Sequence, residues 1–142
     1  MILVVNLEDA DILKDAYKFD KYPKETFGVA VCYVPKLDYS RIERQEDLFI
    51  TAHGNKNEIG DKSLDGLGVS AGELAAFLHQ KLLPGNYQGR IFLSTCDSAP
   101  KYSKALYLAL LEAHPDVSVF GMTGSVYGIG APDDKKWIKA TN

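Results

Sequence analysis

Five short runs of apolar and β-branched residues constrain this chain more than any other feature of its sequence. Each run is closed by a turn or by a cluster of polar residues, and the runs span 2–6, 28–35, 48–53, 90–96 and 117–122. Most of them are apolar at nearly consecutive positions instead of at every second position. This pattern is typical of strands that are covered on both faces, as in a parallel sheet.

Two amphipathic segments lie between the later strands. The segment 70–83 opens with Ser70 and has Glu73 at the spacing of a capping box. The segment from about 100 to 114 opens with Pro100, which suits a first helical turn because an N–H there would lack an intrahelical partner. Strands that alternate with helices at this spacing indicate βαβ units with right-handed crossovers. We therefore predict an α/β fold, a three-layer sandwich around a mostly parallel sheet.

The remaining segments are expected to be less regular. Residues 8–22 can form a further helix, and the polar, Gly-rich segment 55–68 reads as a mobile surface loop. The tail 125–142 is expected to be mostly loop, anchored by Trp137. At 142 residues the chain is long enough for one compact domain, so we predict a single domain over 1–142.

Composition excludes several classes of function. Apolar residues make up 46% and charged residues 25%, as in globular proteins, and the net charge of -3 with no basic cluster argues against nucleic-acid binding.

No apolar run approaches the length of a membrane span. The start lacks the positive region and cleavage site of a signal peptide. With two cysteines, Cys32 and Cys96, reduced thiols and a cytoplasmic location are expected, or export without a cleaved signal.

Two reactive side chains follow consecutive long strands of the predicted sheet. His53 ends the third run, LFITAHG, and Cys96 ends the fourth, IFLSTCDS. Ligands bind outside the carboxyl ends of the strands in open parallel sheets. If the two strands are neighbours, we expect His53 and Cys96 to share one edge of the sheet.

The chemistry of this pair fits nucleophilic catalysis. A thiol is a weak nucleophile until it ionises, and an imidazole or a helix N-terminus favours the thiolate. Cys96 has a candidate imidazole in His53 and a helix that opens shortly after it. The N–H groups of Gly54 and Cys96 can receive the oxyanion of a tetrahedral intermediate.

The two motifs also carry a family resemblance. ITAHG, around His53, and FLSTCDSA, around Cys96, resemble the clan of caspases, gingipains, clostripain, separase and the toxin self-processing cysteine peptidases. They are most similar to bacterial caspase-like domains of the CHAT and toxin self-processing types, with an SACxTA-type nucleophile turn. The resemblance covers about residues 47–124. It implies a caspase-like fold and a His/Cys dyad that cleaves polypeptides without an obligatory third member.

Four further residues are candidates for substrate binding. Asp97 and Ser98 directly follow Cys96, and Ser125 and Tyr127 follow the fifth strand, where the resemblance implies part of a substrate pocket. The primary specificity of the family is not carried over to Asp97.

Other polar residues are interpreted as structural. Asp61 and Asp65 follow His53 in the chain but read as solvated loop charges, and Cys32 lies within an apolar run, as a core residue would. His79 and His114 have no partner in the sequence and are interpreted as surface or capping residues. Two cysteines and three scattered histidines match no zinc spacing, so no metal and no cofactor is expected.

Several functions stay open beside the peptidase. The same dyad can transfer acyl groups in another reaction, such as deamidation by a bacterial effector. The chain is shorter than most active members of the clan, which motivates a second alternative, an inactive caspase-like module that binds a protein partner through the edge of the sheet and segment 55–68. A flavodoxin-like or nucleotide-binding domain is a weaker alternative, because the glycines of 121–130 lack the spacing and the lysine of a phosphate loop.

Overall fold

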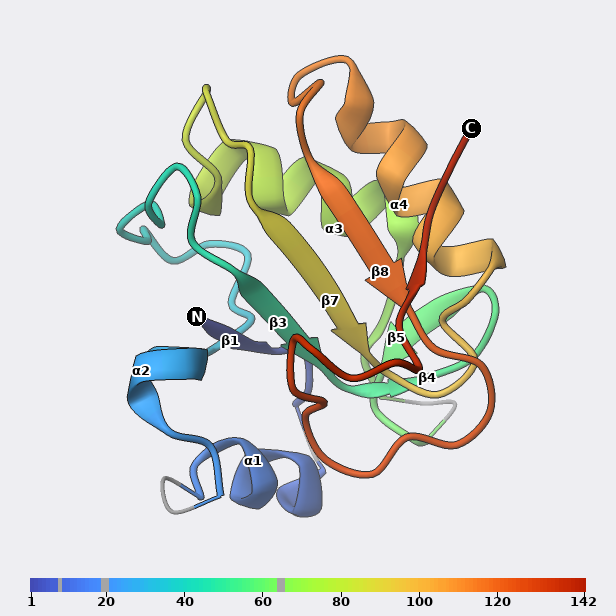
Figure 1. The fold of residues 1–142 in the computed structure, drawn as a ribbon. Helices are drawn as coiled ribbons and strands as arrows, with labels where there is room; N and C mark the ends of the chain where they lie inside the picture. Colours follow the sequence, from blue (N-terminus) through green and yellow to red (C-terminus); the bar gives the residue numbers. More distant parts are fainter. Residues whose placement is uncertain (8, 19–20, 64–65) are drawn as a thin grey trace.

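A six-stranded sheet forms the centre of the molecule (Figure 1). The computed structural model describes residues 1–7, 9–18, 21–63 and 66–142. The strand order is β2-β1-β3-β7-β8-β9, in which the first five strands run parallel and β9 is antiparallel to β8. The strands are β1 (Ile2–Val4), β2 (Ala30–Cys32), β3 (Leu48–Thr51), β7 (Arg90–Ser94), β8 (Ser118–Gly121) and β9 (Ile138–Lys139). Each of the five predicted runs contains one parallel strand, so the α/β prediction with a mostly parallel sheet is confirmed.

Alternate residues of the strands face two separate apolar clusters. Leu3 and Ile50 belong to the cluster that includes α3 (Ala71–Phe77), the π-helical turn η1 (Leu78–Leu82) and α4 (Lys101–Leu111). Phe49 and Phe92 belong to the other cluster, with residues of α1 (Ala10–Ala16), of α2 (Lys24–Phe27) and of the tail. The sheet is therefore covered on both faces, an arrangement consistent with a three-layer α/β fold.

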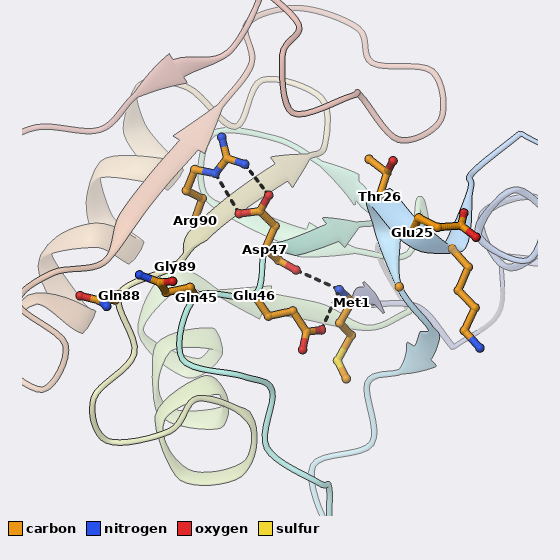
Figure 2. Close-up of a pocket in the computed structure, with 11 residues that line it drawn as sticks. Met1, Glu25, Thr26, Gln45, Glu46, Asp47, Gln88, Gly89 and Arg90 are labelled. Carbon is orange, nitrogen blue, oxygen red and sulfur yellow. Dashed lines mark hydrogen bonds and ion pairs between the residues drawn. The ribbon is translucent and has the colours of Figure 1, made fainter.

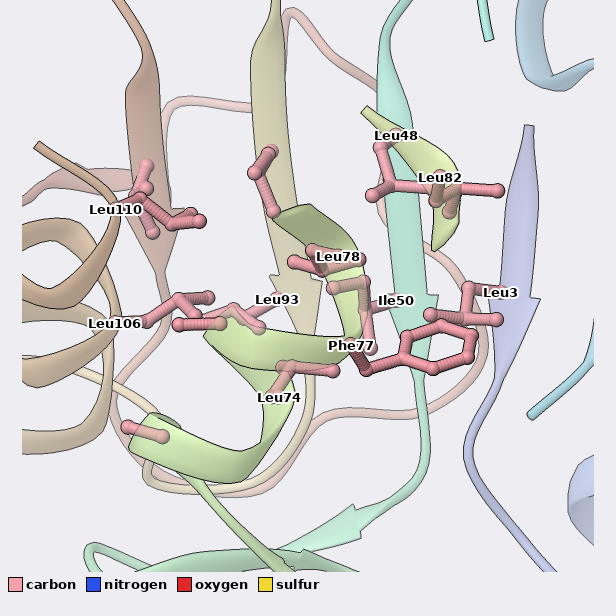
Figure 3. Packing of buried hydrophobic residues seen from close by; sticks show 14 of the residues in the cluster. Leu3, Leu48, Ile50, Leu74, Phe77, Leu78, Leu82, Leu93, Leu106 and Leu110 are labelled. Carbon is pink, nitrogen blue, oxygen red and sulfur yellow. The ribbon is translucent and has the colours of Figure 1, made fainter. Parts of the chain in front are cut away.

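The capping box predicted at the start of α3 is present. Ser70 Oγ accepts a hydrogen bond from the backbone N–H of Glu73 at 3.2 Å, and the Glu73 carboxylate accepts one from the backbone N–H of Ser70 at 3.4 Å. Figure 3 shows how α3 and η1 then lay Leu74, Leu78 and Leu82 onto the sheet, where each is fully buried. Burial of one such side chain contributes about 1.5–3 kcal/mol. The capping box and this packing therefore both stabilise the helix that begins after Ser70.

Part of the segment after His53 forms strands, so the prediction of a loop over 55–68 is wrong for 58–60 and for 68. The strands β4 (His53–Gly54), β5 (Glu58–Gly60) and β6 (Gly68–Ser70) form a small antiparallel sheet in that order. The carboxylate of Asp61 accepts hydrogen bonds from the backbone N–H groups of Leu7 and Leu67 at 3.0 and 2.9 Å. Asp61 therefore joins three chain segments and is not the solvated charge that the sequence indicated.

The two ends of the chain differ in how well they follow the prediction. The helix expected over 8–22 is shorter, because α1 ends at Ala16 and Pro23 instead precedes α2. The tail 125–142 is mostly without regular structure, as predicted, apart from β9. Trp137 anchors it: the indole ring packs 5.0 Å from the ring of Phe92, and Nε1 donates a hydrogen bond to the carbonyl oxygen of Ala131 at 2.7 Å. Among residues 1–7, 9–18, 21–63 and 66–142, no helix has both the length and the hydropathy to cross a membrane.

Candidate functional site

The two candidate catalytic residues follow directly paired positions of neighbouring strands. Thr51, at the end of β3, is opposite Ser94, at the end of the adjacent parallel strand β7. His53 and Cys96 each come two positions after this pair. The strand adjacency that the sequence analysis required is therefore present, and both residues emerge at the carboxyl ends of the central strands.

His53 and Cys96 also line the same cavity. It has a volume of about 260 Å³, and both side chains are half-buried in its wall. Gly54 lines the cavity as well, and the rest of its wall comes from the small sheet and its turns: Asn55, Glu58, Ile59, Gly60, Asp61, Lys62, Leu67 and Gly68. The small sheet β4-β5-β6, which the sequence did not predict, thus forms most of the wall of the candidate site.

Gly54 allows the two halves of the site to come close together. A Cβ atom at this position would lie 2.9 Å from Cβ of Thr95 and 3.0 Å from the carbonyl oxygen of Cys96. No other residue fits this approach without movement of the backbone that carries the cysteine. The N–H groups of Gly54 and Cys96 therefore belong to chain segments in direct contact, while their role as oxyanion donors stays a prediction.

Cys96 sits on a tight turn that is fastened to the loop after β8. Asp97 has a φ of +51°, in the left-handed region that few residues other than glycine adopt. Its N–H donates to the carbonyl oxygen of Gly124 at 3.0 Å, and its carboxylate accepts from the N–H of Gly124 at 2.9 Å. The N–H of Val126 points to the Cys96 sulfur, with N and Sγ 3.3 Å apart. The sulfur also lies 3.8 Å from the carbonyl oxygen of Val126, to which the thiol can donate.

Asp97 and Ser98 hold the turn together. Ser98 is fully buried, and its hydroxyl donates to the carbonyl oxygen of Leu93 at 3.1 Å and accepts from the N–H of Met122 at 3.0 Å. The hydroxyl does not reach the surface, so the structure places Ser98 inside the turn and not on the wall of the cavity. Asp97 is exposed, but its carboxylate is engaged by Gly124.

Ser125 and Tyr127, the other two candidates for substrate binding, line a separate pocket. It has a volume of about 370 Å³ and includes Val126, whose backbone touches the Cys96 sulfur. Tyr127 is 91% exposed. The structure therefore places these residues beside the turn that carries Cys96 but not in the cavity that His53 and Cys96 share.

Asp9 is a site residue that the sequence analysis missed. Its Oδ2 lies 2.5 Å from Nε2 of His53. Asp61 and Asp65 follow His53 more closely in the chain, but Asp61 accepts hydrogen bonds from backbone N–H groups and Asp65 lies outside the described residues. Asp9 reaches His53 because β1 pairs with β3, with Val4 opposite Thr51. An acidic residue shortly after a strand of the same parallel sheet was the signal that could have found it.

Thr95, next to the candidate nucleophile, has a buried hydroxyl with no partner in the described part of the chain. The residue is fully buried, and among the described residues its Oγ1 has no hydrogen-bond partner. A Cβ atom on Gly54 would lie 3.0 Å from this oxygen. A buried polar group without a partner costs about 1–3 kcal/mol, so the contact between the two site segments is made at some expense of stability.

His79 is exposed, as predicted, whereas His114 and Cys32 differ from their predicted surroundings. His79 Nδ1 and His114 Nε2 lie 3.1 Å apart, and His114 is 1% exposed, so the prediction of a surface or capping residue is wrong for His114. Cys32 is half-buried on the edge strand β2, 3.6 Å from the Tyr17 hydroxyl, and is not a core residue. The described part of the chain contains no group of three or more His, Cys, Asp or Glu side chains that could hold a metal ion.

A larger pocket lies at the opposite end of the sheet (Figure 2). It has a volume of about 600 Å³ and is lined by residues at the amino ends of β1, β3 and β7. It contains an ion pair, in which Arg90 donates from Nε and Nη2 to the carboxylate of Asp47 at 2.8 and 2.6 Å. This pair joins the starts of β3 and β7, the two strands that carry His53 and Cys96 at their other ends.

Comparisons of the chain with protein-family models, with curated proteins and with solved structures find no match.

Proposed function

We propose that the protein is a caspase-like cysteine endopeptidase. The observation that supports this best is the shared cavity, to which two neighbouring parallel strands contribute an imidazole and a thiol. The ITAHG and FLSTCDSA motifs, which resemble those of the caspase clan, fall on these two strand ends. The substrate class that follows from the proposal is a polypeptide.

The proposed reaction passes through an acyl-enzyme. The Cys96 thiolate attacks the scissile carbonyl carbon, so a C–S bond forms and the carbonyl oxygen becomes an oxyanion held by the N–H groups of Gly54 and Cys96. Protonated His53 then gives its proton to the leaving amine as the C–N bond breaks. A water molecule attacks the thioester, with His53 as base, and releases the carboxylic acid and the thiol.

Substitution of Cys96 tests the proposal. We expect Cys96→Ala to abolish cleavage of a peptide library, while circular dichroism and the unfolding midpoint stay unchanged, because the side chain is small and half-buried. Cys32→Ser is the matched control, since it removes the other thiol from the edge of the sheet. Cleavage by purified Cys96→Ala protein at the wild-type rate would rule out the mechanism.

Two assays separate the peptidase from its alternatives. Release of ammonia from glutamine-containing proteins without chain cleavage would identify the dyad as that of a deamidase. A binding module, for which the 91% exposed Tyr127 beside the nucleophile turn is the supporting observation, needs no thiolate. Iodoacetamide at neutral pH should then modify Cys96 no faster than a free thiol, whereas a dyad predicts faster alkylation that extends to lower pH.

A further inference from the structure

The contact between Asp9 and His53 carries an inference that rests on the proposed function. We infer that Asp9 is a positioning residue, which holds the His53 ring in one orientation with Nδ1 free for the thiol. Nε2 lies 2.5 Å from Asp9 Oδ2, so the ring and the carboxylate are in direct contact. Because Nε2 is engaged, Nδ1 is the ring nitrogen that can exchange a proton with Cys96.

Asp9 is itself held on several sides. Its N–H donates to Oδ1 of Asn6 at 2.7 Å, and its carbonyl oxygen accepts from Nδ2 of Asn6 at 2.5 Å. Its second carboxylate oxygen accepts from the N–H of Asp11 and thereby caps α1. Asn6 is buried, so its two hydrogen bonds fix the backbone of Asp9 just after the end of β1.

The pair is partly shielded from solvent. The side chains of Asp9 and His53 are 19% and 34% exposed, so solvent only partly screens their attraction. A carboxylate that contacts one ring nitrogen holds the imidazole in one tautomer and one orientation. In serine peptidases, replacement of the corresponding aspartate by asparagine leaves the geometry intact and lowers kcat about 10⁴-fold, because the wrong tautomer results.

Asp9→Asn is the decisive variant, because asparagine caps a helix as well as aspartate does. The cap on α1 is therefore kept, and only the group that meets Nε2 changes. Asp11→Asn is the matched control: it removes the same charge two positions away, from a side chain that makes no described contact with His53. Both variants are made in a Cys32→Ser background, so that Cys96 is the only thiol.

Alkylation by iodoacetamide between about pH 5 and 9 gives the first readout. We expect Asp9→Asn to lower the alkylation rate of Cys96 at pH 7 at least tenfold and to move the pH profile upward, while Asp11→Asn changes the rate less than twofold. The ring ¹⁵N shifts of His53 should also change from the Nε2–H tautomer to a mixture in Asp9→Asn alone. Equal effects of the two variants, or faster alkylation in Asp9→Asn, would overturn the inference.

Peptide hydrolysis separates this inference from the proposed function. In an active peptidase, Asp9→Asn should lower kcat and leave KM nearly unchanged, because Asp9 does not line the cavity of His53 and Cys96. If the wild-type protein cleaves no peptide but Asp9→Asn still changes the alkylation rate and the His53 tautomer, the peptidase is refuted and the role of Asp9 is retained. Cleavage that Asp9→Asn leaves intact would refute the role of Asp9 alone.

Discussion

A methyl group added to Gly54 should separate the two halves of the candidate site. In Gly54→Ala, the new carbon would lie 2.9 Å from Cβ of Thr95 and 3.0 Å from the carbonyl oxygen of Cys96. Carbon atoms in contact are about 3.5–4.0 Å apart, so the methyl group is too close to Thr95 by about 0.6 Å. The carbonyl oxygen belongs to the backbone of the nucleophile turn, and Thr95 is fully buried, so neither neighbour can move freely.

Overpacking of this kind destabilises a fold by about 1–3 kcal/mol. For a chain of this length, each kcal/mol corresponds to a change in Tm of roughly 3–5 °C. Gly72→Ala is the matched control, because a Cβ atom there has no neighbour within 4 Å and the residue lies in α3. Removal of a glycine from a helix stabilises by about 0.5–1 kcal/mol. The same chemical change should thus lower stability at position 54 and raise it at position 72.

Urea denaturation followed by circular dichroism measures both variants, and iodoacetamide reports on the site. We expect Gly54→Ala to shift the urea midpoint down and to slow alkylation of Cys96, because β4 with His53 is pushed away from the turn. Gly72→Ala should alkylate like the wild type. A Gly54→Ala protein with wild-type stability and reactivity would show that the close approach of the two segments does not assemble the site.

Two further perturbations concern buried polar groups. Burial, the neighbouring His79 and the charge of Arg41 lower the pKa of His114, so the unfolded chain takes up this proton at a higher pH than the folded protein does. The free energy of unfolding should therefore fall as the pH drops below about 6.5, by a total of about 1.4 kcal/mol for each pH unit that separates the folded and unfolded pKa values of His114. His114→Phe should flatten this dependence in thermal denaturation across pH 5–8. Thr95→Val should raise the free energy of unfolding in urea by about 1 kcal/mol, because it removes a buried hydroxyl without a described partner, and a fall would show that the hydroxyl is bonded.

The fold was accessible from the sequence because its strands are short, apolar and buried on both faces. Leu48–Thr51 and Arg90–Ser94 each lie within a single apolar run. His53 and Cys96 stand where those runs end. The small sheet was not accessible, because Glu58–Gly60 and Gly68–Ser70 are three-residue strands in a polar, Gly-rich segment. Their pairing depends on contacts with β4 and on Asp61, which no local pattern encodes.

The histidines show the same division between local and tertiary information. Periodicity placed His79 and His114 on or near helices, but their contact depends on how the start of η1 meets the turn after α4. The position of Asp9 depends likewise on a strand order that the sequence analysis did not predict. Residue types and strand ends could be inferred from the chain, while the choice of neighbours required the assembled sheet.

The strand order β1-β3-β7 determines the order of the acid, the imidazole and the thiol in the candidate site. Each of these neighbouring parallel strands is followed by one reactive group: Asp9 after β1, His53 after β3 and Cys96 after β7. An imidazole has two nitrogens on opposite sides of its ring, so it can link an acid and a thiol only from between them. Exchange of β1 and β3 in the sheet would put the acid beside the thiol and the imidazole outside, and the charge of Asp9 would then oppose formation of a thiolate. The central position of β3 is therefore the property on which a Cys–His–Asp arrangement depends.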